Sequence, residues 1–310
     1  MTATDRVEVE ARAKVNLLLR VLSREAAGYH GIETVFVLIE TSDRLTVERT
    51  GNGIDLVVSG AETGPVEENL AYRAAAAVLR ASGASFGVRI HLEKSIPVRA
   101  GLGGGSSDAA ATLKAVNELA GNLVPPPELF QLGAGLGADV PFFVSGARMA
   151  LGWNRGERLF RLKPPPSAPC LLAVPTVGMG TQEAYERLDV GRDYTTPRAT
   201  VMLDETAFER WGNIARLGGN DFESVVFAKE PAVRTLFERI AETNPLLVRM
   251  TGSGSTVFAI YRRERDLDDA MMTIGTREQK LIKTRTLEQG AEKGLPEARV
   301  GPRPMENGAV

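Results

Sequence analysis

The chain has 310 residues, of which 43% are hydrophobic, so it is long enough for about two domains with a packed core in each. Its formal net charge is −2, so the protein lacks the overall basic character that favours nucleic-acid binding, and nucleic acid is not an expected partner. No run of residues is apolar enough to span a membrane, so a membrane is not an expected partner either. Cys170 is the only cysteine, which excludes an intrachain disulfide or cysteine-based zinc site and, with a polar N-terminus, predicts a cytoplasmic protein.

The first part of the chain is rich in strand signals. Lys14 and Asn16 stand at the start of an apolar run; such a lysine is either a surface side chain or a cation that holds phosphate or carboxylate. Tyr29 and His30 follow in a turn, where they either pack incidentally or recognise a flat ring. A helix is predicted over 69–81 with Asn69 as its N-cap. Strands are predicted at 7–13, 15–22, 32–40, 44–48, 54–59 and 86–92.

The segment RAGLGGGSSDAA, Arg99–Ala110, lies between the last of these strands and a helical pattern. Glycine lets the backbone approach a ligand closely, and Ser106 and Ser107 predict a helix start, where unpaired N–H groups and the helix dipole attract phosphate. The Gly-Lys-Ser/Thr of a P-loop is absent, and Ser106 stands where a dinucleotide-binding pattern needs its third glycine. A flexible loop is the alternative, but the flanking strand and helix favour a phosphate site.

Asp139 follows a short helix that begins at the prolines 125–127, and it stands in a mostly apolar segment. It is either a helix cap or turn residue, or a carboxylate held in a partly dry pocket as a base. Strands continue over 148–162, and the proline-rich spacer 163–169 indicates a domain boundary.

The second part has the alternating pattern of an α+β domain. The turn TGSGS, Thr251–Ser255, is by itself only a hairpin signal. The chain after residue 288 is polar and rich in glycine and proline, which predicts a flexible tail. Strands are predicted at 170–174, 247–250, 256–261 and 281–286, and helices at 181–188, 204–216, 221–227, 232–242 and from about 266.

Six motifs in order resemble the GHMP kinase superfamily over about residues 11–261: AKVNLLLRV, GYHGIET, IPVRAGLGGGSSDAA, GADVPFFV, NDFESVVF and RMTGSGSTVF. Within it, GYH and NDFE are typical of a branch whose substrate is a diphosphocytidyl sugar alcohol. The resemblance implies a two-domain α+β fold with the active site between the domains. An N-terminal domain like ribosomal protein S5 domain 2 would span 1–163, a ferredoxin-like C-terminal domain 164–287, and the tail 288–310.

The resemblance also implies an ATP-dependent kinase that phosphorylates the C2 hydroxyl of this substrate on the non-mevalonate route to isopentenyl diphosphate, as a monomer or homodimer. Lys14 and Asp139 would be the catalytic pair, TGSGS would close the cleft, and Mg²⁺ would accompany ATP with Ser107 as a candidate ligand. Asn16, Tyr29, His30, Thr181 and Tyr185 would bind the substrate. The ATP phosphates would be wrapped by Pro97, Val98, Arg99, Ala100, Gly101, Leu102, Gly103, Gly104, Gly105, Ser106 and Ser107.

Two alternatives stay open. Another small-molecule GHMP kinase, acting on homoserine or a mevalonate derivative, would keep the loop without needing the Tyr29–His30 pair. A non-catalytic sensor of ATP and a metabolite could dispense with Lys14 and Asp139, and the presence of both favours an enzyme. Arg99 departs from the family pattern, in which a small residue is common at this position.

Overall fold

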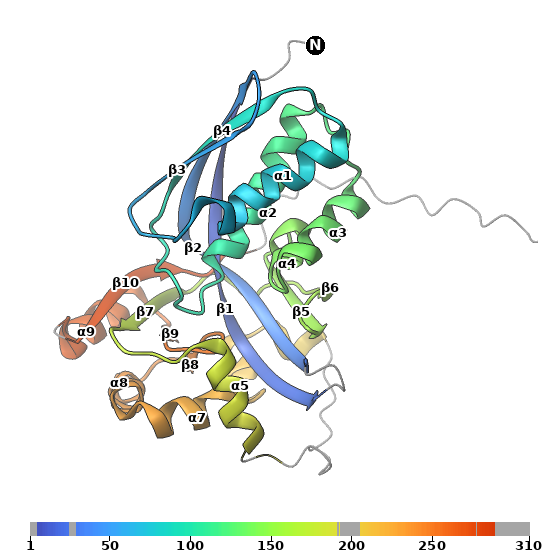
Figure 1. Ribbon diagram of the computed structural model, residues 1–310. Coiled ribbons are helices and arrows are strands. Elements are labelled where there is room, and N and C mark those ends of the chain that lie inside the picture. The colour runs from blue at the N-terminus through green and yellow to red at the C-terminus, as the bar shows by residue number, and fades with distance from the viewer. Residues whose placement is uncertain (1–4, 25–28, 191, 193–204, 277, 289–310) are drawn as a thin grey trace, which may run out of the picture.

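Two long antiparallel strands, β1 (Arg6–Arg24) and β2 (His30–Thr50), run through both halves of the computed structural model (Figure 1). The structure describes residues 5–24, 29–190, 192, 205–276 and 278–288. The sequence predicts two strands in each of these stretches, and that prediction is wrong. The polar residues between the two predicted strands do not interrupt β2, because Asp43 is buried and accepts hydrogen bonds from the N–H groups of Ser95 and Ile96.

The pairing of β1 with β2 shifts register at one point that matters for the site. Arg12 pairs with Ser42, whereas Lys14 pairs with Leu38. Such an irregularity frees backbone groups from the ladder. The N–H of Lys14 donates to the carbonyl of Leu102 at 3.0 Å, which ties β1 to the glycine-rich segment.

The first sheet has six strands, and four helices cover one of its faces (Figure 1). Two strands pair with the edge of β2 that lies opposite β1: β4 (Gly87–Glu93) and β5 (Met149–Asn154). β3 (Ile54–Ser59) lies parallel to β4, and β6 (Arg158–Arg161) pairs with β5. The 3-10 turn η1 (Val66–Glu68) precedes the helices, which are α1 (Leu70–Ser82), α2 (Gly104–Leu119), α3 (Pro126–Leu136) and α4 (Val140–Ser145).

The two predicted helix starts have different outcomes. Asn69 caps α1 as predicted, because its side-chain oxygen accepts a hydrogen bond from the N–H of Ala71 at 2.9 Å. The prediction for Ser106 and Ser107 is wrong, since α2 begins at Gly104 and the capping residue is Gly103, with a φ of 71°. Glycine tolerates this left-handed conformation, so the helix starts earlier and both serines lie in its first turn.

The second sheet has four antiparallel strands in the order β10-β7-β9-β8, and it confirms the α+β prediction. Its strands are β7 (Pro169–Pro175), β8 (Leu247–Met250), β9 (Val257–Ile260) and β10 (Gln279–Arg285). Alternate side chains of β7 face opposite cores: Leu171 packs with the helices, and Leu172 packs toward β1 and β2. The helices are α5 (Thr181–Val190), α7 (Phe222–Lys229), α8 (Pro231–Glu242) and α9 (Glu264–Ile274).

The prediction of one continuous helix over 204–216 is wrong. Residue 204 lies outside the described residues, and the rest forms a 3-10 turn, η2 (Glu205–Phe208), followed by the short α6 (Trp211–Ile214). Phe208, Trp211 and Ile214 are all buried in one cluster. A spacing of three residues suits a 3-10 turn, where side chains three apart lie on one line.

The two sheets fall on either side of the proline-rich spacer, since the first ends at Arg161 and the second begins at Pro169. Packing continues across this point, because Val15 and Leu17 of β1 share a core cluster with Phe258 of β9. We therefore keep 1–163 and 164–287 as a proposed division, and the predicted tail, apart from residue 288, lies outside the described residues. Among the described helices, none is long and apolar enough to cross a membrane.

Candidate active site

The glycine-rich segment forms the wall between two clefts. The larger cleft has a volume of about 1160 Å³ and lies between the two sheets, and the smaller has a volume of about 320 Å³. Gly101, Gly103 and Ser106 line both clefts. A ligand seated in the smaller cleft can therefore reach across the glycines into the larger one.

Two of these glycines are required by their backbone and their neighbours. Gly101 has a φ of 74°, and a Cβ there would lie 2.2 Å from the carbonyl oxygen of Thr251. Gly103 has a φ of 71°, and a Cβ there would meet the side chain of Lys14 at 3.1 Å. Glycine is thus needed where the segment packs against the other sheet and against the lysine.

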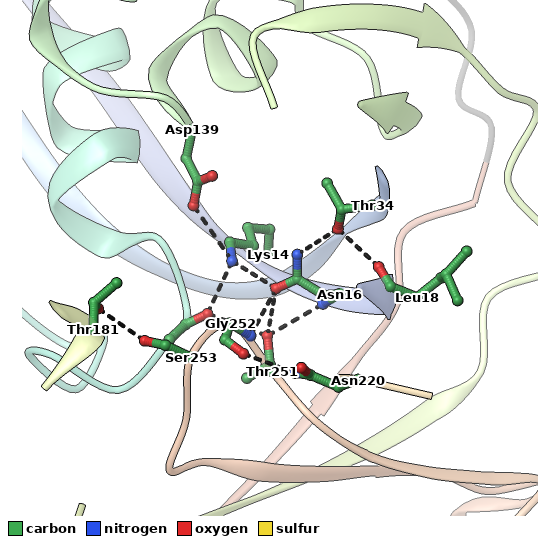
Figure 2. Close-up of polar contacts among 11 residues, drawn as sticks. Lys14, Asn16, Leu18, Thr34, Asp139, Thr181, Asn220, Thr251, Gly252 and Ser253 are labelled. Carbon is green, nitrogen blue, oxygen red and sulfur yellow. Dashed lines mark hydrogen bonds and ion pairs between the residues drawn. The ribbon is translucent and has the colours of Figure 1, made fainter. Parts of the chain in front are cut away.

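Lys14 is buried, with a side-chain exposure of 3%, and its ammonium points to the centre of the site (Figure 2). It donates to the side-chain oxygen of Asn16 at 2.7 Å and to the carbonyl of Gly101 at 3.0 Å. Its nitrogen also lies 3.4 Å from a carboxylate oxygen of Asp139. A buried ammonium needs such partners, so the cation is held at the edge of the glycine-rich wall.

Asp139 occupies the N-cap position of α4, but within the described structure its side chain makes no capping hydrogen bond. Its carboxylate turns instead toward Lys14 and is 30% exposed, on the wall of the larger cleft (Figure 2). Of the two sequence interpretations, the geometry favours the carboxylate in a pocket. A carboxylate that reaches into a cleft can accept a proton from a hydroxyl group bound there.

Asn16 joins the two sheets. Its side-chain oxygen accepts hydrogen bonds from Lys14, from the hydroxyl of Thr251 at 3.0 Å and from the N–H of Gly252 at 2.9 Å. Its side-chain nitrogen donates to the hydroxyl of Thr34 at 2.8 Å. Asn16 lines the larger cleft, yet most of its hydrogen-bonding capacity serves the protein itself.

A buried charge cluster that sequence reasoning missed lies at the floor of the smaller cleft. Lys94 forms ion pairs with Asp43 and, at 2.7 Å, with Asp108 in the first turns of α2. Burial raises the pKa of Asp108 to about 7, although Lys94 opposes the shift. A lysine at the end of an alternating strand and an aspartate in an alanine-rich helix were the available signals. Thr63, Glu68 and Asn69 complete this cleft beside the glycines.

Aromatic rings gather at the other end of the larger cleft. His30 stacks on Tyr185 with the ring centroids 4.6 Å apart, and its Nε2 lies 2.8 Å from a carboxylate oxygen of Asp189. Tyr29 is 54% exposed, and the guanidinium of Arg155 lies 3.6 Å from the centre of its ring. Burial, with a smaller contribution from the charge of Asp139, raises the pKa of Tyr185 to about 12, so its phenol stays protonated.

Two hydroxyls lie between the aromatic end and the glycine-rich wall. Thr181, the first residue of α5, and Ser253 of the TGSGS turn have their side-chain oxygens 2.8 Å apart (Figure 2). Both residues line the larger cleft. Hydroxyls at a helix N-terminus are suited to anionic oxygens. The resemblance names Thr181 as a substrate-binding residue and includes Ser253 only in the TGSGS turn that closes the cleft, because contact between a helix start and a distant hairpin leaves no local pattern.

Among the described residues, no group of three or more His, Cys, Asp or Glu side chains could hold a metal ion. Ser106 lines both clefts, whereas Ser107 is buried in the helix, with its N–H bonded to the carbonyl of Gly103. The oxygen donors that line the smaller cleft include the Ser106 hydroxyl and the carboxylates of Glu68 and Asp108, and the Asp139 carboxylate lines the larger cleft. These residues fit a magnesium ion held chiefly by phosphate oxygens, since Mg²⁺ keeps several ligands from water and phosphate.

A glycine-rich wall at a helix N-terminus, facing a lysine–aspartate pair between two α+β halves, is the arrangement of a GHMP kinase. The family model for the GHMP kinase N-terminal domain matches residues 69–147, and that for the C-terminal domain matches residues 202–271. Relatives named 4-diphosphocytidyl-2-C-methyl-D-erythritol kinase are 41% identical in Pelotomaculum thermopropionicum, over 81% of this chain and 87% of the relative, and 41% identical in Moorella thermoacetica, over 83% and 90%. The chain therefore belongs to the 4-diphosphocytidyl-2-C-methyl-D-erythritol kinase family of GHMP kinases.

Solved structures agree with this assignment. The crystal structure of a 4-(cytidine 5'-diphospho)-2C-methyl-D-erythritol kinase has a TM-score of 0.77 and 34% identity, and the match covers 92% of this chain and 100% of that one. A homoserine kinase from Cytophaga hutchinsonii has a TM-score of 0.66 at 15% identity, covering 93% and 96% of the two chains. At that identity the second comparison supports the fold alone.

Proposed function

We propose that this protein transfers the γ-phosphate of ATP to the C2 hydroxyl of 4-diphosphocytidyl-2-C-methyl-D-erythritol, giving its 2-phosphate, in the non-mevalonate route to isopentenyl diphosphate. The observation that carries the proposal is the Lys14–Asp139 pair, 3.4 Å apart, at the glycine-rich wall that two clefts share. Phosphoryl transfer needs mainly positioning and charge neutralisation, and this place can supply both.

In this proposal ATP lies in the smaller cleft with its phosphates against the wall made by Pro97–Ser106. The N–H groups at the start of α2 and the positive end of its dipole attract the phosphate oxygens. The γ-phosphate then reaches the larger cleft at Gly101 and Gly103, where both clefts meet. Bound Mg²⁺ would be held chiefly by ATP, with the Ser106 hydroxyl as a candidate protein ligand, and it would neutralise phosphate charge.

The cytidine end of the second substrate lies among the rings of Tyr29, His30 and Tyr185. Aromatic faces stack on a base, and the polar atoms of a histidine can bond to its edge. The Thr181 and Ser253 hydroxyls then lie along the path of the diphosphate, and Asn16 borders the sugar alcohol. The larger cleft extends from these aromatic rings to Lys14, so it can hold a long substrate.

Asp139 takes the proton from the C2 hydroxyl while the oxygen of that hydroxyl bonds to the γ-phosphorus of ATP. The bond between the γ-phosphorus and the oxygen that it shares with the β-phosphate breaks, and ADP is released. The ammonium of Lys14 stabilises the charge that the transferring group carries. Because Gly101 and Asn16 hold that ammonium from the other side, it need not move during the reaction.

The test of the substrate is an ADP-release assay with the diphosphocytidyl compound, its diphosphouridyl analogue, homoserine and mevalonate. We expect fast turnover of the first only. His30→Ala is expected to raise KM for the diphosphocytidyl substrate by about tenfold, because it removes a hydrogen bond to the edge of the base and the ring that packs on Tyr185. His91→Ala, at an exposed position of β4, is the matched control and should leave KM unchanged. Equal turnover of the uridine analogue would contradict cytidine recognition.

Arg99 provides a second test of the smaller cleft. It is exposed, has a φ of 57°, and lines this cleft beside the glycines. A left-handed arginine costs about 1 to 2 kcal/mol relative to glycine, and we infer that its guanidinium offsets this cost by binding the phosphates. Arg99→Ala and Arg99→Gly are both expected to raise KM for ATP by about two- to fivefold, which corresponds to the roughly 0.4 to 1 kcal/mol of one solvated ion pair.

Thermal unfolding separates the two variants. Only Arg99→Gly relieves the backbone, so it should unfold at a higher temperature than Arg99→Ala. An unchanged KM for ATP in both variants would place the guanidinium away from the nucleotide.

We further propose that this protein is a cytoplasmic enzyme that acts on small molecules as a monomer or homodimer.

A further inference from the structure

The TGSGS turn joins β8 to β9 and brings one side chain of the second sheet, Thr251, into contact with the first. Thr251 is completely buried. Its hydroxyl accepts a hydrogen bond from the N–H of Asn16 at 3.1 Å. The same hydroxyl lies 3.0 Å from the side-chain oxygen of Asn16 and 3.1 Å from the carbonyl of Gly101. Thr251 thus contacts the two groups of the first half that also bind Lys14.

The ammonium of Lys14 and the hydroxyl of Thr251 share the same two acceptors (Figure 2). Lys14 donates to the side-chain oxygen of Asn16 at 2.7 Å and to the carbonyl of Gly101 at 3.0 Å. A hydroxyl has one proton and can donate to one acceptor at a time, whereas an ammonium has three. After serving both acceptors, Lys14 has one proton left for the side on which Asp139 lies.

The position of Thr251 is itself held from below by Asn220, a residue of the NDFE motif. The side-chain nitrogen of Asn220 donates to the carbonyls of Met250, at 2.8 Å, and Gly252, at 2.7 Å, one on each side of Thr251. Its side-chain oxygen accepts from the N–H of Phe222 at 3.0 Å. The turn is therefore fixed at both neighbours of Thr251, and the hydroxyl has little freedom to follow a displaced partner.

Resting on the proposed function, we propose that Thr251 is a positioning residue for phosphate transfer: its hydroxyl holds the Asn16 side chain and the Gly101 carbonyl where they aim the Lys14 ammonium at Asp139. Removing the hydroxyl leaves the N–H of Asn16 without its acceptor and takes away one of the three hydrogen bonds to the Asn16 side-chain oxygen, so this oxygen can shift on its remaining bonds to Lys14 and Gly252. Lys14 has a long, flexible chain, so its ammonium follows the acceptors. A displacement of about 1 Å at a reacting group can cost about 100-fold in rate.

The test compares four variants by steady-state kinetics with ATP and the diphosphocytidyl substrate. Thr251→Val removes the hydroxyl at constant shape, and Thr251→Ser keeps the hydroxyl without the methyl group. Thr251→Ala is the partner of the serine variant, since the two differ only in the hydroxyl. Thr256→Val is the matched control, because Thr256 is a buried threonine at the other end of the same turn whose hydroxyl has no hydrogen-bond partner among the described residues.

We expect Thr251→Val to lower kcat by about 10- to 100-fold while KM for both substrates changes by less than about threefold. Thr251→Ser should keep kcat within about threefold of the original protein, and Thr256→Val within about twofold. Melting temperatures show that each variant is folded at the assay temperature. Should Thr251→Val fail to fold, the serine and alanine variants make the same comparison.

Equal kcat values for the serine and alanine variants would overturn the proposal, because the hydroxyl would then be irrelevant. A rise in KM for ATP with kcat unchanged would also overturn it, since Thr251 would then act in binding. If the unmodified protein fails to phosphorylate the diphosphocytidyl substrate at all, the proposed function falls first and the positioning role falls with it. Turnover by the unmodified protein keeps the two questions separate.

Discussion

Asp139→Asn is expected to lower kcat by about 10²- to 10⁴-fold, the range for loss of a general base. Asparagine keeps the shape of the side chain but cannot accept the proton of the C2 hydroxyl at neutral pH. The carboxylate is 30% exposed, and Lys14 keeps its hydrogen bonds to Asn16 and Gly101 in the variant, so we expect the fold to survive the loss of this charge. KM for ATP should change by less than about threefold, because the nucleotide lies beyond the glycine-rich wall.

The matched control for this variant is Glu186→Gln, another carboxylate on the wall of the same cleft, which bonds to Gln182 at 2.9 Å. Its kcat should stay within about threefold, since it lies outside the contact network of Lys14. A loss below about fivefold for Asp139→Asn would remove Asp139 from the role of base. Equal losses in the two variants would indicate a general need for negative charge in the cleft.

Lys14→Met is expected to lower kcat by about 10²- to 10³-fold, which is the usual cost of one lost donor to a developing negative charge. Methionine fills most of the space of the lysine stem. The Asn16 side-chain oxygen keeps the N–H of Gly252, and the carbonyl of Gly101 keeps the hydroxyl of Thr251. The ion pair with Asp139 is lost, but that carboxylate remains partly solvated. The variant should therefore fold while losing its transition-state cation.

Combining the two changes tests whether the pair acts as a unit. The double variant Lys14→Met with Asp139→Asn should lose little more activity than the worse single variant, because residues of one catalytic unit are not additive. Lys114→Met is the control for a lost lysine, since Lys114 donates to the carbonyl of Phe143 on the outer helices. Losses that multiply fully would show that Lys14 and Asp139 act independently.

Much of the fold could be predicted because its signals are local. Asn69 caps the first helix because a cap needs only a side chain and an N–H two residues away. The strand β8 at Leu247–Met250 has the predicted bounds, and the outward position of His91 follows from alternation along β4. The glycine-rich segment predicts a phosphate site for the same reason, since a strand, a glycine run and a helix start are consecutive in sequence.

Some wrong predictions came from contacts that override local preference. The polar residues near Asp43 predict a break between two strands, but the N–H groups of Ser95 and Ile96 donate to the Asp43 carboxylate and β2 continues through it. Ser106 and Ser107 read as a cap, but Gly103 takes the left-handed conformation and the helix begins before them. A partner distant in sequence decided the first outcome, and a conformation that glycine adopts at little cost decided the second.

By itself, the sequence determined the α+β class and, through its resemblance to a family, the pairing of Lys14 with Asp139, and it predicts anion binding at the glycine-rich segment. Only the tertiary structure decided that Asn16 joins the two halves, that Lys94 lies between two aspartates, and that Thr251 shares acceptors with Lys14. These contacts span 87 residues between Lys14 and Gly101 and 235 between Asn16 and Thr251. Hydrogen bonds over such separations form only after the chain has packed, so no local pattern encodes them.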